Sequence, residues 1–456
     1  MVCPLIVLYA LGYAGIPNEG VIKTGLVSVA TAPPGASVLV GGAPYPQKTP
    51  TFVRNLPPGR YPVTLQLKGH RSWSSSVEVE EEKATVLENV LLVPAEPETE
   101  RLAEGPFQEL AATGDAPFLL ARSGPRAGEA VVLDWRTGRT RPLLPPGSVF
   151  LSNRIEFWEP VPESPYLFLA LKGEDRRLCV RAKLGRGPHE IEDLSHLFPE
   201  RFAHLQWDPA DRDELFFAED GFLSRVNVKS SAVYPKFAEG VRGYGLAGRK
   251  VYVVDGLGRV TRMDRDGTNA ELVSEEPLLA SYLARNKAFY RILVLDREKM
   301  LFWSEKGPLL AAGISYPLAE GGVEEVVPYV SGGKSKALVR ERHRIGAVDF
   351  SGELPWLTWL GRGRELVRAV WAHGGSHVLF QDGRKVFLLE ADVPVKAHLE
   401  ELLEVKEGSA FAFVEETGKI YYLDRAGALV SWRLAPPRPS LLGRGAEGQP
   451  EGAAEP

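Results

Sequence analysis

The sequence predicts an all-β protein with two parts, a small β-sandwich followed by a β-propeller. Three observations support this prediction. Glycine and proline occur 46 and 36 times in 456 residues, and they separate short apolar runs as turns separate strands. Apolar and polar residues alternate within several of these runs, which is the pattern of half-buried strands. After residue 106 the succession of strand, turn and strand repeats at a regular interval, which is typical of propeller blades.

The composition excludes some classes of function. The chain has 54 Lys plus Arg against 59 Asp plus Glu, giving a net charge of -5, and it has no basic block that could neutralise a run of phosphates. Nucleic acid is therefore not an expected partner. Cys3 and Cys179 are far apart in the sequence, so neither a disulfide framework nor a cysteine zinc cluster is expected.

Residues 25–94 are predicted to form the sandwich. In "YPVTLQLKG" the apolar side chains from Tyr61 to Leu67 share one face, as a half-buried strand requires. Pro62 points outward, where the missing amide proton costs no hydrogen bond of the sheet. Two turns between strands are expected from residues that tolerate turn geometry. They are the hairpin turn at Gly41 and Gly42 and the corner at Pro57, Pro58 and Gly59.

The same segment resembles the PEGA domain, a small β-sandwich module of bacterial surface-associated proteins. The resemblance covers about 70 residues, and its motifs stand in the family's order and spacing: "TAPPGASVLVGG", "KTPTFVRNLPPGRYPVTLQLKGHRSW" and "VLENVLLVP". It implies that Trp73 faces the core. Gly41 and His70 depart from the family, which usually has Asp or Asn before the turn glycine and Tyr after the later glycine.

Residues 1–24 form an apolar segment with no Lys or Arg before Lys23. The run from Pro4 to Ile16 is shorter than the roughly 20 residues of a membrane-spanning helix, and it lacks the charged start of a signal peptide. Its length fits either a clipped membrane anchor or a buried N-terminal strand or helix. The stretch "LYALGYAG" followed by "VIKTG" is similar to membrane-anchored relatives of the PEGA domain, which favours the anchor.

The propeller is predicted at residues 107–435, after an acidic linker at 95–106 and before a disordered tail at 436–456 that is rich in Pro, Gly and Ala. The units recur every ~42 residues, the usual size of a four-stranded blade. Eight blades are expected, or seven if the first or last unit is partial. The hairpin turns of the units are expected near Arg126, Glu174, Asp220, Asp255, Asp296, Glu341, Asp382 and Thr417.

Two further segments bear on this fold. The turn "MDRDGTNAEL" resembles the strand-connecting turns of TolB-like propellers, and the repeat as a whole is similar to WD40-like propellers. These likenesses support the fold and say little about partners. The propeller half has no long helical period, although "VKAHLEELLEV" near Ala397 has a pattern suited to one or two helical turns.

Two motifs that could carry chemistry have simpler explanations. Gly243 to Gly248 has G-x-G-x-x-G spacing, but a dinucleotide loop needs a helix after it, and a predicted strand follows here. We expect a glycine-rich connection between strands of the propeller. Asp264, Asp266 and Thr268 could offer oxygen ligands to calcium. The closing acidic residue of a calcium loop is missing, so a hydrogen-bonded hairpin turn is expected.

Histidines and a serine in the predicted connections are also expected to have no catalytic or metal-binding role. His189, His196 and His204 are spaced by seven and eight residues. Zinc ligands usually lie closer together, so we expect solvated loop histidines. Ser331 to Lys334 has the Ser-x-x-Lys spacing of some acyl-transfer enzymes, but its two glycines disfavour the helix start that this motif needs.

Two remaining groups of candidate functional residues are also expected to have mainly structural roles. His373, Ser376 and His377 lack a positioned carboxylate, so we expect them to form a blade connection. Tryptophans in or beside predicted strands usually pack between blades, and some rim a binding face. They are Trp207, Trp303, Trp356, Trp359, Trp371 and Trp432.

The sequence therefore predicts a non-enzymatic binding or scaffold protein of the cell envelope. A membrane anchor and the sandwich would hold the propeller on the extracytoplasmic side, where its loop face binds a protein, peptide or glycan. The sequence indicates no catalytic, cofactor-binding or metal-binding residue, and it does not identify the binding residues. The alternative function is a propeller-based hydrolase or lyase with an axial active site, and the alternative location is the cytoplasm.

Overall fold

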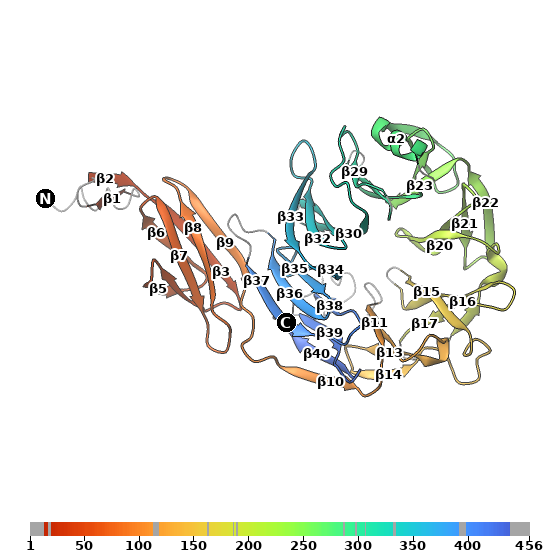
Figure 1. Ribbon diagram of the computed structural model, residues 1–456, viewed down its shortest axis with the longest axis horizontal. Helices are drawn as coiled ribbons and strands as arrows, with labels where there is room; N and C mark the ends of the chain where they lie inside the picture. Colours follow the sequence, from red (N-terminus) through yellow and green to blue (C-terminus); the bar gives the residue numbers. More distant parts are fainter. Residues whose placement is uncertain are drawn as a thin grey trace, which may run out of the picture.

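The computed structural model shows an all-β protein in which a sandwich stands beside a ring of sheets (Figure 1). It describes residues 13–16, 20–112, 118–161, 164–185, 187, 190–285, 288–296, 299–305, 307–331, 334–391 and 398–437. Among these residues, none of the helices combines the length and the apolar character needed to cross a bilayer. The predicted fold class is confirmed.

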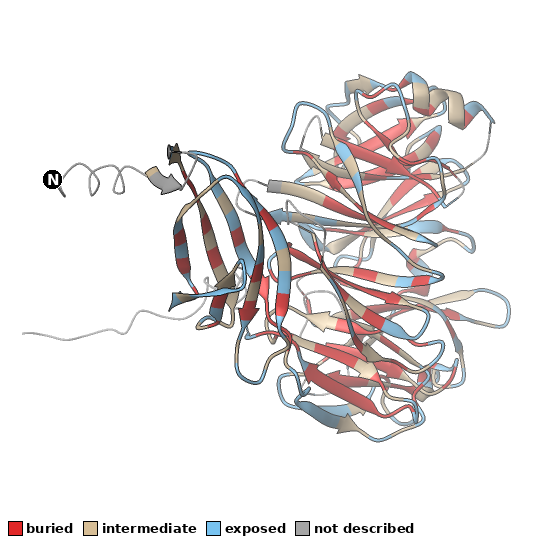
Figure 2. Ribbon diagram, turned by 60° about the vertical axis from the view of Figure 1, so that its left-hand side comes forward, coloured by how far each residue is buried: buried red, intermediate tan, exposed pale blue. Residues whose placement is uncertain are grey.

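The sandwich consists of a three-stranded sheet, β6-β3-β9, and a four-stranded sheet, β5-β4-β7-β8. Val27, Val63 and Leu65 are fully buried between the two sheets, while Pro62 is exposed, as predicted. The alternation of buried and exposed residues along these strands is visible in Figure 2. The strands are β3 (Gly25–Ala32), β4 (Ser37–Val40), β5 (Ala43–Lys48), β6 (Thr51–Leu56), β7 (Gly59–Gln66), β8 (Trp73–Val79) and β9 (Ala84–Leu91).

The predicted turns of the sandwich are present. Gly41 and Gly42 join β4 to β5 with φ of +60° and +82°, a conformation that glycine adopts without strain. The Pro-Pro-Gly corner joins β6 to β7, where the hydroxyl of Tyr61 donates to the carbonyl oxygen of Pro57 at 2.9 Å.

Eight blades form the ring in the described part of the chain. Blades 1 to 4 follow one another along the chain. Blade 1 has β11 (Glu109–Ala112), β12 (Phe118–Arg122), β13 (Ala130–Asp134) and β14 (Arg139–Pro142), and blade 2 has β15 (Arg154–Pro160), β16 (Tyr166–Lys172), β17 (Arg177–Lys183) and β18 (Ile191–Asp193). Blade 3 has β19 (Ala203–Asp208), β20 (Asp211–Glu219), β21 (Phe222–Asn227) and β22 (Ala232–Ala238), and blade 4 has β23 (Val241–Ala247), β24 (Lys250–Asp255), β25 (Arg259–Asp264) and β26 (Glu271–Glu275).

Blades 5 to 8 complete the ring, and the first strand of each blade lies nearest its centre (Figure 1). Blade 5 has β27 (Tyr290–Asp296), β28 (Lys299–Trp303) and β29 (Leu310–Ala311), and blade 6 has β30 (Val323–Ser331), β31 (Lys334–Glu341), β32 (Arg344–Asp349) and β33 (Trp356–Arg362). Blade 7 has β34 (Leu366–Ala372), β35 (His377–Asp382), β36 (Lys385–Glu390) and β37 (Leu399–Glu404), and blade 8 has β38 (Ala412–Val414), β39 (Lys419–Leu423), β40 (Leu429–Arg433) and β10 (Thr99–Ala103).

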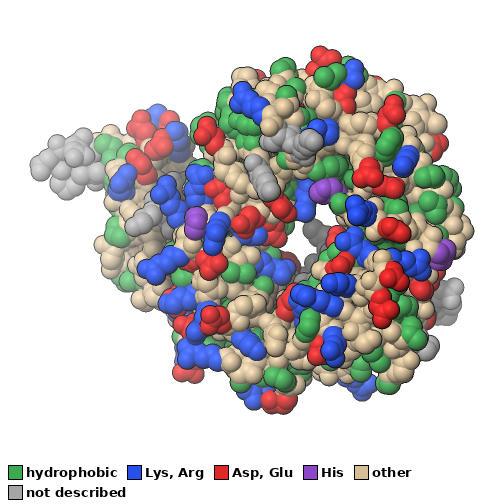
Figure 3. Space-filling model, turned by 45° about the vertical axis from the view of Figure 1, so that its right-hand side comes forward, with side chains coloured by type: hydrophobic (Ala, Val, Ile, Leu, Met, Phe, Trp, Pro, Cys, Tyr) green, Lys and Arg blue, Asp and Glu red, His purple; other side chains and the backbone are tan. Residues whose placement is uncertain are grey.

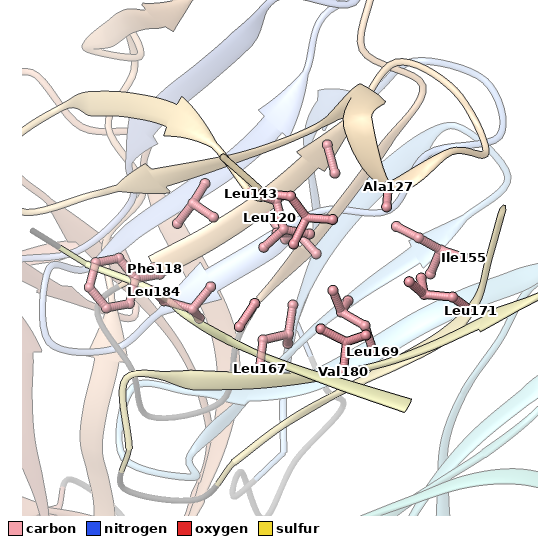
Figure 4. Packing of buried hydrophobic residues seen from close by; sticks show 14 residues of the cluster. Phe118, Leu120, Ala127, Leu143, Ile155, Leu167, Leu169, Leu171, Val180 and Leu184 are labelled. Atoms are coloured by element: carbon pink, nitrogen blue, oxygen red, sulfur yellow. The ribbon is translucent and has the colours of Figure 1, made fainter. Parts of the chain in front are cut away.

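Each pair of neighbouring blades shares one hydrophobic core. In β12 of blade 1, Phe118 and Leu120 face blade 2, whereas Leu119 and Ala121 face blade 8. Alternate side chains of one strand therefore enter two cores, which explains why this strand is buried on both faces. Figure 4 shows the core between blades 1 and 2, where side chains from both sheets point toward one another.

The ring is closed by β10, which pairs antiparallel with β40 of the last blade. This differs from the predicted linker at 95–106. The sequence of β10 is "TERLA", and its first three residues are exposed. A polar strand at the outer edge of a sheet has no apolar alternation, so the sequence pattern did not predict it. The strand supplies the fourth position of blade 8 from the other end of the propeller sequence.

Six of the predicted turns join the second and third strands of their blades, but two are shifted. Asp296 and Thr417 lie between the first and second strands of blades 5 and 8. Blade 5 is also irregular, because its fourth position is reduced to a bridge between Leu309 and Ala319. A short helix, α2 (Pro277–Arg285), connects blades 4 and 5, and the sequence did not predict it.

The described residues also bear on two other predictions of local structure. Tyr13–Ile16 (β1) and Gly20–Lys23 (β2) form a β-hairpin at the end of the sandwich far from the propeller (Figure 1). The rest of the predicted anchor lies outside the described residues, as does the tail from 438. The predicted helical turns near Ala397 are replaced by strand β37 at Leu399–Glu404, because pairing with β36 overrides the local helical pattern.

The sandwich packs directly on blades 7 and 8. Leu91 and Val93, at the end of its last strand, join the hydrophobic core between these two blades. Trp73 faces the sandwich core as predicted, and its indole nitrogen donates to a carboxylate oxygen of Glu390 at 2.6 Å. Arg71 donates to the carboxylate of Glu400 at 2.8 Å. The sandwich and the propeller therefore meet at an interface that combines apolar packing with polar contacts.

We expect Gly245→Ala to destabilise the propeller. A methyl group at Gly245 would collide with the carbonyl oxygen of Ile292 on the neighbouring blade. Gly256→Ala is the matched control, because nothing lies within 4 Å of the added atom. Urea unfolding should show that the first change lowers the free energy of unfolding by about 1–3 kcal/mol. Equal stability of the two variants would contradict the close approach of these blades.

We expect Trp73→Phe to weaken the contact between sandwich and propeller. The change keeps an aromatic ring in the core and removes the indole donor from the buried carboxylate of Glu390. Unfolding experiments should show a loss of about 1–3 kcal/mol, and limited proteolysis should cut faster between residues 94 and 98. Trp356→Phe, at a tryptophan that is 67% exposed, should change neither measurement. A Trp73→Phe variant that behaves like this control would contradict the role of the hydrogen bond.

Candidate functional site

The candidate site lies on the wall of the central opening, on the first strands of blades 2 to 5. Figure 3 shows an opening through the ring, with Lys or Arg, acidic and His side chains around it. We define the channel-wall site by five residues from these strands and from the residue before β27. They are Glu159, His204, Tyr244, Phe289 and Arg291.

Two glycines allow the inner strands that carry the site to lie close together. Gly243 and Gly245 lie in β23, which pairs in parallel with β27 of the next blade. A Cβ atom on either glycine would collide with the carbonyl oxygens of Tyr290 and Ile292. The G-x-G-x-x-G spacing therefore forms part of a strand, and the predicted connection was wrong. Its glycines allow two inner strands to approach, which brings Tyr244 beside Arg291.

His204 is held in an unusual backbone conformation. Its φ is +53°, and the pairing of β19 with β20 shifts register between Ala203 and Gln206. Such a bulge redirects a side chain, and bulges and strained backbone are common beside functional sites. The imidazole of His204 lies parallel to the ring of Phe289, with 3.8 Å between centroids. His204 is exposed, as predicted, but it is a positioned side chain of an inner strand, so its prediction as a loop histidine was wrong.

Tyr244 connects three blades. The one proton of its hydroxyl is shared between the carbonyl oxygen of His204 and that of Phe216, which lies at 3.1 Å. Its ring meets Phe289 edge-on, with 6.0 Å between centroids. Burial raises the pKa of Tyr244 well above its ordinary value, so the hydroxyl stays protonated and donates. The tyrosine fixes the bulge at His204 against blades 4 and 5.

Two ionisable groups of the site have shifted pKa values. Burial raises the pKa of Glu159 to about 7, and the positive charge of Arg291 opposes this rise. Loss of water contact lowers the pKa of His204, the charge of Arg291 lowers it further, and Glu305 opposes the change. The two shifts place the pKa of Glu159 above that of His204, the reverse of the ordinary order of a carboxyl and an imidazole. Shifted groups of this kind often occur at functional sites.

The structure places the other sequence candidates in structural roles. Asp266 accepts hydrogen bonds from the amide and hydroxyl of Thr268 at 2.9 and 2.6 Å, so the predicted hairpin turn is confirmed. Ser331 ends β30 and Lys334 begins β31, which are paired strands. His196 lies in a short 3-10 helix, η2 (Ser195–Leu197), and His189 lies outside the described residues. Among the described residues, no cluster of His, Cys, Asp and Glu could hold a metal ion.

Ser376 and His377 lie in and after the predicted connection of blade 7, and they are buried against the sandwich. The hydroxyl of Ser376 is 2.9 Å from Nδ1 of His377, and Nε2 of His377 is 3.9 Å from Glu390. This order resembles a catalytic triad, but the serine hydroxyl donates to the carbonyl oxygen of His373 at 2.7 Å. The space beside these residues is only about 20 Å³, too small for a substrate.

The tryptophans divide into buried and exposed positions. Trp207, Trp303 and Trp432 are buried in cores between blades, as predicted. Trp371 donates from its indole nitrogen to the carbonyl oxygen of Val327 at 3.0 Å. Trp356 differs, because it is exposed on the outer strand of blade 6. These tryptophans therefore contribute more to the packing between blades than to the wall of the opening.

An open groove of about 380 Å³ lies between the sandwich and the last blade. The groove forms where the two parts of the protein meet. Its lining residues are Pro33, His70, Pro94, Glu96, Glu98, Arg433, Leu434, Ala435, Pro436 and Pro437.

Comparison with known proteins confirms the first resemblance. Residues 24–93 match the family model of the PEGA domain, and no curated protein matches the chain. The chain is similar to the computationally designed protein Ika8 at 10% identity, with 74% of this chain and 98% of that chain covered and a TM-score of 0.45.

Two natural propellers are also similar. The β-propeller domain of Cps50 (Swd1) from Myceliophteria thermophila has 12% identity, covers 74% of this chain and 100% of that chain, and has a TM-score of 0.36. The N-terminal domain of Nup159 has 12% identity, covers 75% of this chain and 98% of that chain, and has a TM-score of 0.37. The assignment of a propeller rests on the strand pairing within each blade.

We expect Glu159→Gln to stabilise the protein in a pH-dependent way. The folded carboxyl has a pKa of about 7 against an ordinary value of 4.5, so the unfolded chain releases this proton at lower pH. The two proteins should be equally stable below pH 4.5, and the advantage of the variant should grow up to about pH 7 and then stay constant. Thermal unfolding should show a difference of roughly 3–5 °C at pH 8.

Glu156→Gln is the matched control on the same strand, because Glu156 is paired with Arg177 at 2.6 Å. This change removes an ion pair and should lower the unfolding temperature slightly at neutral pH. A Glu159→Gln variant without a pH-dependent gain would show that burial does not raise the pKa of Glu159.

Proposed function

We propose that the protein is a non-enzymatic binding scaffold of the cell envelope, in which the PEGA sandwich holds a propeller that receives a protein, peptide or glycan at its central opening. The observation that carries the proposal is the channel-wall site. Exposed Arg291 and the flat pair of His204 and Phe289 offer a cation beside an aromatic surface, and arginine and phenylalanine are among the residues enriched at protein interfaces.

The junction of the sandwich and the propeller supports the scaffold part of the proposal. The sandwich packs on blades 7 and 8, whereas the channel-wall site lies on blades 2 to 5. In a ring of eight blades, blade 3 is opposite blade 7, so the docked sandwich leaves the site uncovered (Figure 1). The PEGA domain supports an extracytoplasmic location, since the resemblance implies surface-associated proteins. The sandwich would stand between the envelope and the propeller.

One observation favours the alternative of an axial active site. Glu159 has a pKa of about 7, and an exposed imidazole lies on the neighbouring blade. Groups that change protonation near neutral pH suit general acid and base catalysis. A hydrolase or lyase that uses Glu159 and His204 is therefore the second candidate function.

We expect Arg291→Glu to weaken ligand binding at the opening. Full-length protein should be tested on arrays of bacterial glycans and peptides, and the affinity for its ligands measured by calorimetry. Charge reversal beside Glu159 should lower the affinity by roughly 30-fold or more, the scale of a binding hot spot. Arg60→Glu, at an exposed arginine of the sandwich, should leave the affinity unchanged.

The same ligands separate the two candidate functions. Mass spectrometry of each ligand after incubation should show no chemical change if the protein is a scaffold. Turnover that Glu159→Gln abolishes without loss of binding would establish the enzyme instead. Equal affinity of the Arg291→Glu and Arg60→Glu variants would place the binding surface outside the opening.

A further inference from the structure

A second feature of the channel wall concerns Arg368 on β34, the first strand of blade 7. Its side chain is only partly exposed, and its Nε atom is buried with no hydrogen-bond partner. Within the described part of the chain, neither a hydrogen bond nor an ion pair connects its guanidinium to the protein. The guanidinium lies near the ring of Phe411, 6.0 Å from the centroid. The guanidinium of Arg368 therefore has no hydrogen-bond acceptor among the described residues.

Other arginines with a buried Nε are held by the protein. Arg141 donates to the carbonyl oxygen of Lys183 at 2.6 Å, and Arg265 donates to the carboxylate of Asp208 at 2.6 Å. Arg225 lies 3.5 Å from a carboxylate oxygen of Glu214. These arginines fasten blades or strands to one another. Arg368 makes no such bond, so a fastening role does not explain it.

The neighbours of Arg368 are already engaged. Its partner across the strand pair is Gln381, whose amide nitrogen donates to the carbonyl oxygens of Gly383 and Ser409 at 2.8 Å. The amide oxygen of Gln381 accepts from the amide of Phe411 at 3.3 Å. The amide of Gln381 thus positions the turn beside Arg368 and makes no hydrogen bond to the guanidinium.

Charges on blade 6 determine which anion fits. Arg340 is close to Arg368 and is bonded to the carboxylates of Glu324 and Glu325. Burial lowers the pKa of Arg368, Glu325 opposes this change and Arg340 adds to it. The two arginines and the two glutamates together carry no net charge, so a small anion would be held by hydrogen bonds from the guanidinium of Arg368. The two glutamates would repel a doubly charged anion more strongly than a singly charged one.

We propose that Arg368 is the anchor of a carboxylate-binding site on the wall of the opening between blades 7 and 8. The planar guanidinium can donate two parallel hydrogen bonds to a carboxylate, a geometry that an arginine without internal partners is free to adopt. The inference rests on the proposed function, because it assigns an acidic group to the ligand that the opening receives.

Small anions test the site without the natural ligand. The full chain is titrated with sodium acetate, sodium sulfate and sodium phosphate at equal ionic strength, with sodium chloride as the reference. Calorimetry and thermal unfolding give the affinity and the shift of the unfolding temperature. We expect acetate to bind more tightly than sulfate or phosphate, and to raise the unfolding temperature.

Three variants decide the role of Arg368. Arg368→Gln should lower the affinity for acetate at least tenfold and should fold as stably as the wild type without anion, because it removes a desolvated charge. Arg368→Lys keeps the charge but loses the fork of donors, so it should bind acetate more weakly than the wild type. Arg364→Gln, at an exposed arginine of the preceding turn, should respond to acetate like the wild type.

The outcomes against the proposal are distinct. An equal response of the wild type and Arg368→Gln to acetate, or no response of the wild type, would overturn the site. Tighter binding of sulfate or phosphate would overturn the carboxylate assignment. A clear loss of stability of Arg368→Gln without anion would show a structural role. Failure of the proposed scaffold function would appear in the Arg291→Glu experiment with larger ligands, which does not use these anions.

Discussion

The burial of every blade on both sides is the constraint on which the rest of the structure depends. Leu119 and Leu120 are adjacent in one strand, yet they belong to the cores on opposite sides of blade 1. A blade at the end of an open row would expose one of these apolar faces to water. Closure removes both ends, and β10 completes it by pairing with β40, the strand nearest the end of the propeller sequence.

Closure also brings the first strands of neighbouring blades side by side. Where β23 meets β27, the approach is close enough to exclude a Cβ atom at Gly243 and Gly245. This approach places Tyr244 where its hydroxyl reaches the carbonyl oxygen of Phe216 in the previous blade. The site on the channel wall is therefore a product of blade contact. Its residues come from four blades and have no common motif in the sequence.

The sequence allowed prediction of features set by local chemistry. Asp220 and Asp382 each precede a glycine at a hairpin turn, and these hairpins lie where the repeat predicts them. Features set by distant partners could not be predicted. Glu159 and Arg291 interact across more than a hundred residues of sequence, and the bulge at His204 depends on its pairing with β20. The residues "AHLQWD" alternate regularly between apolar and polar through His204, so the sequence pattern predicts a regular strand and does not indicate this bulge.

The junction with the sandwich follows a different physical logic from the junctions between blades. Blades meet through apolar side chains, whereas the indole nitrogen of Trp73 donates to Glu390 within an interface that is buried on both sides. Burial raises the pKa of Glu390, and this hydrogen bond opposes the rise. A buried carboxyl without a donor is costly, so orientations of the sandwich that move Trp73 away are disfavoured. Apolar packing of Leu91 and Val93 alone would tolerate many orientations, and the directional bond selects among them.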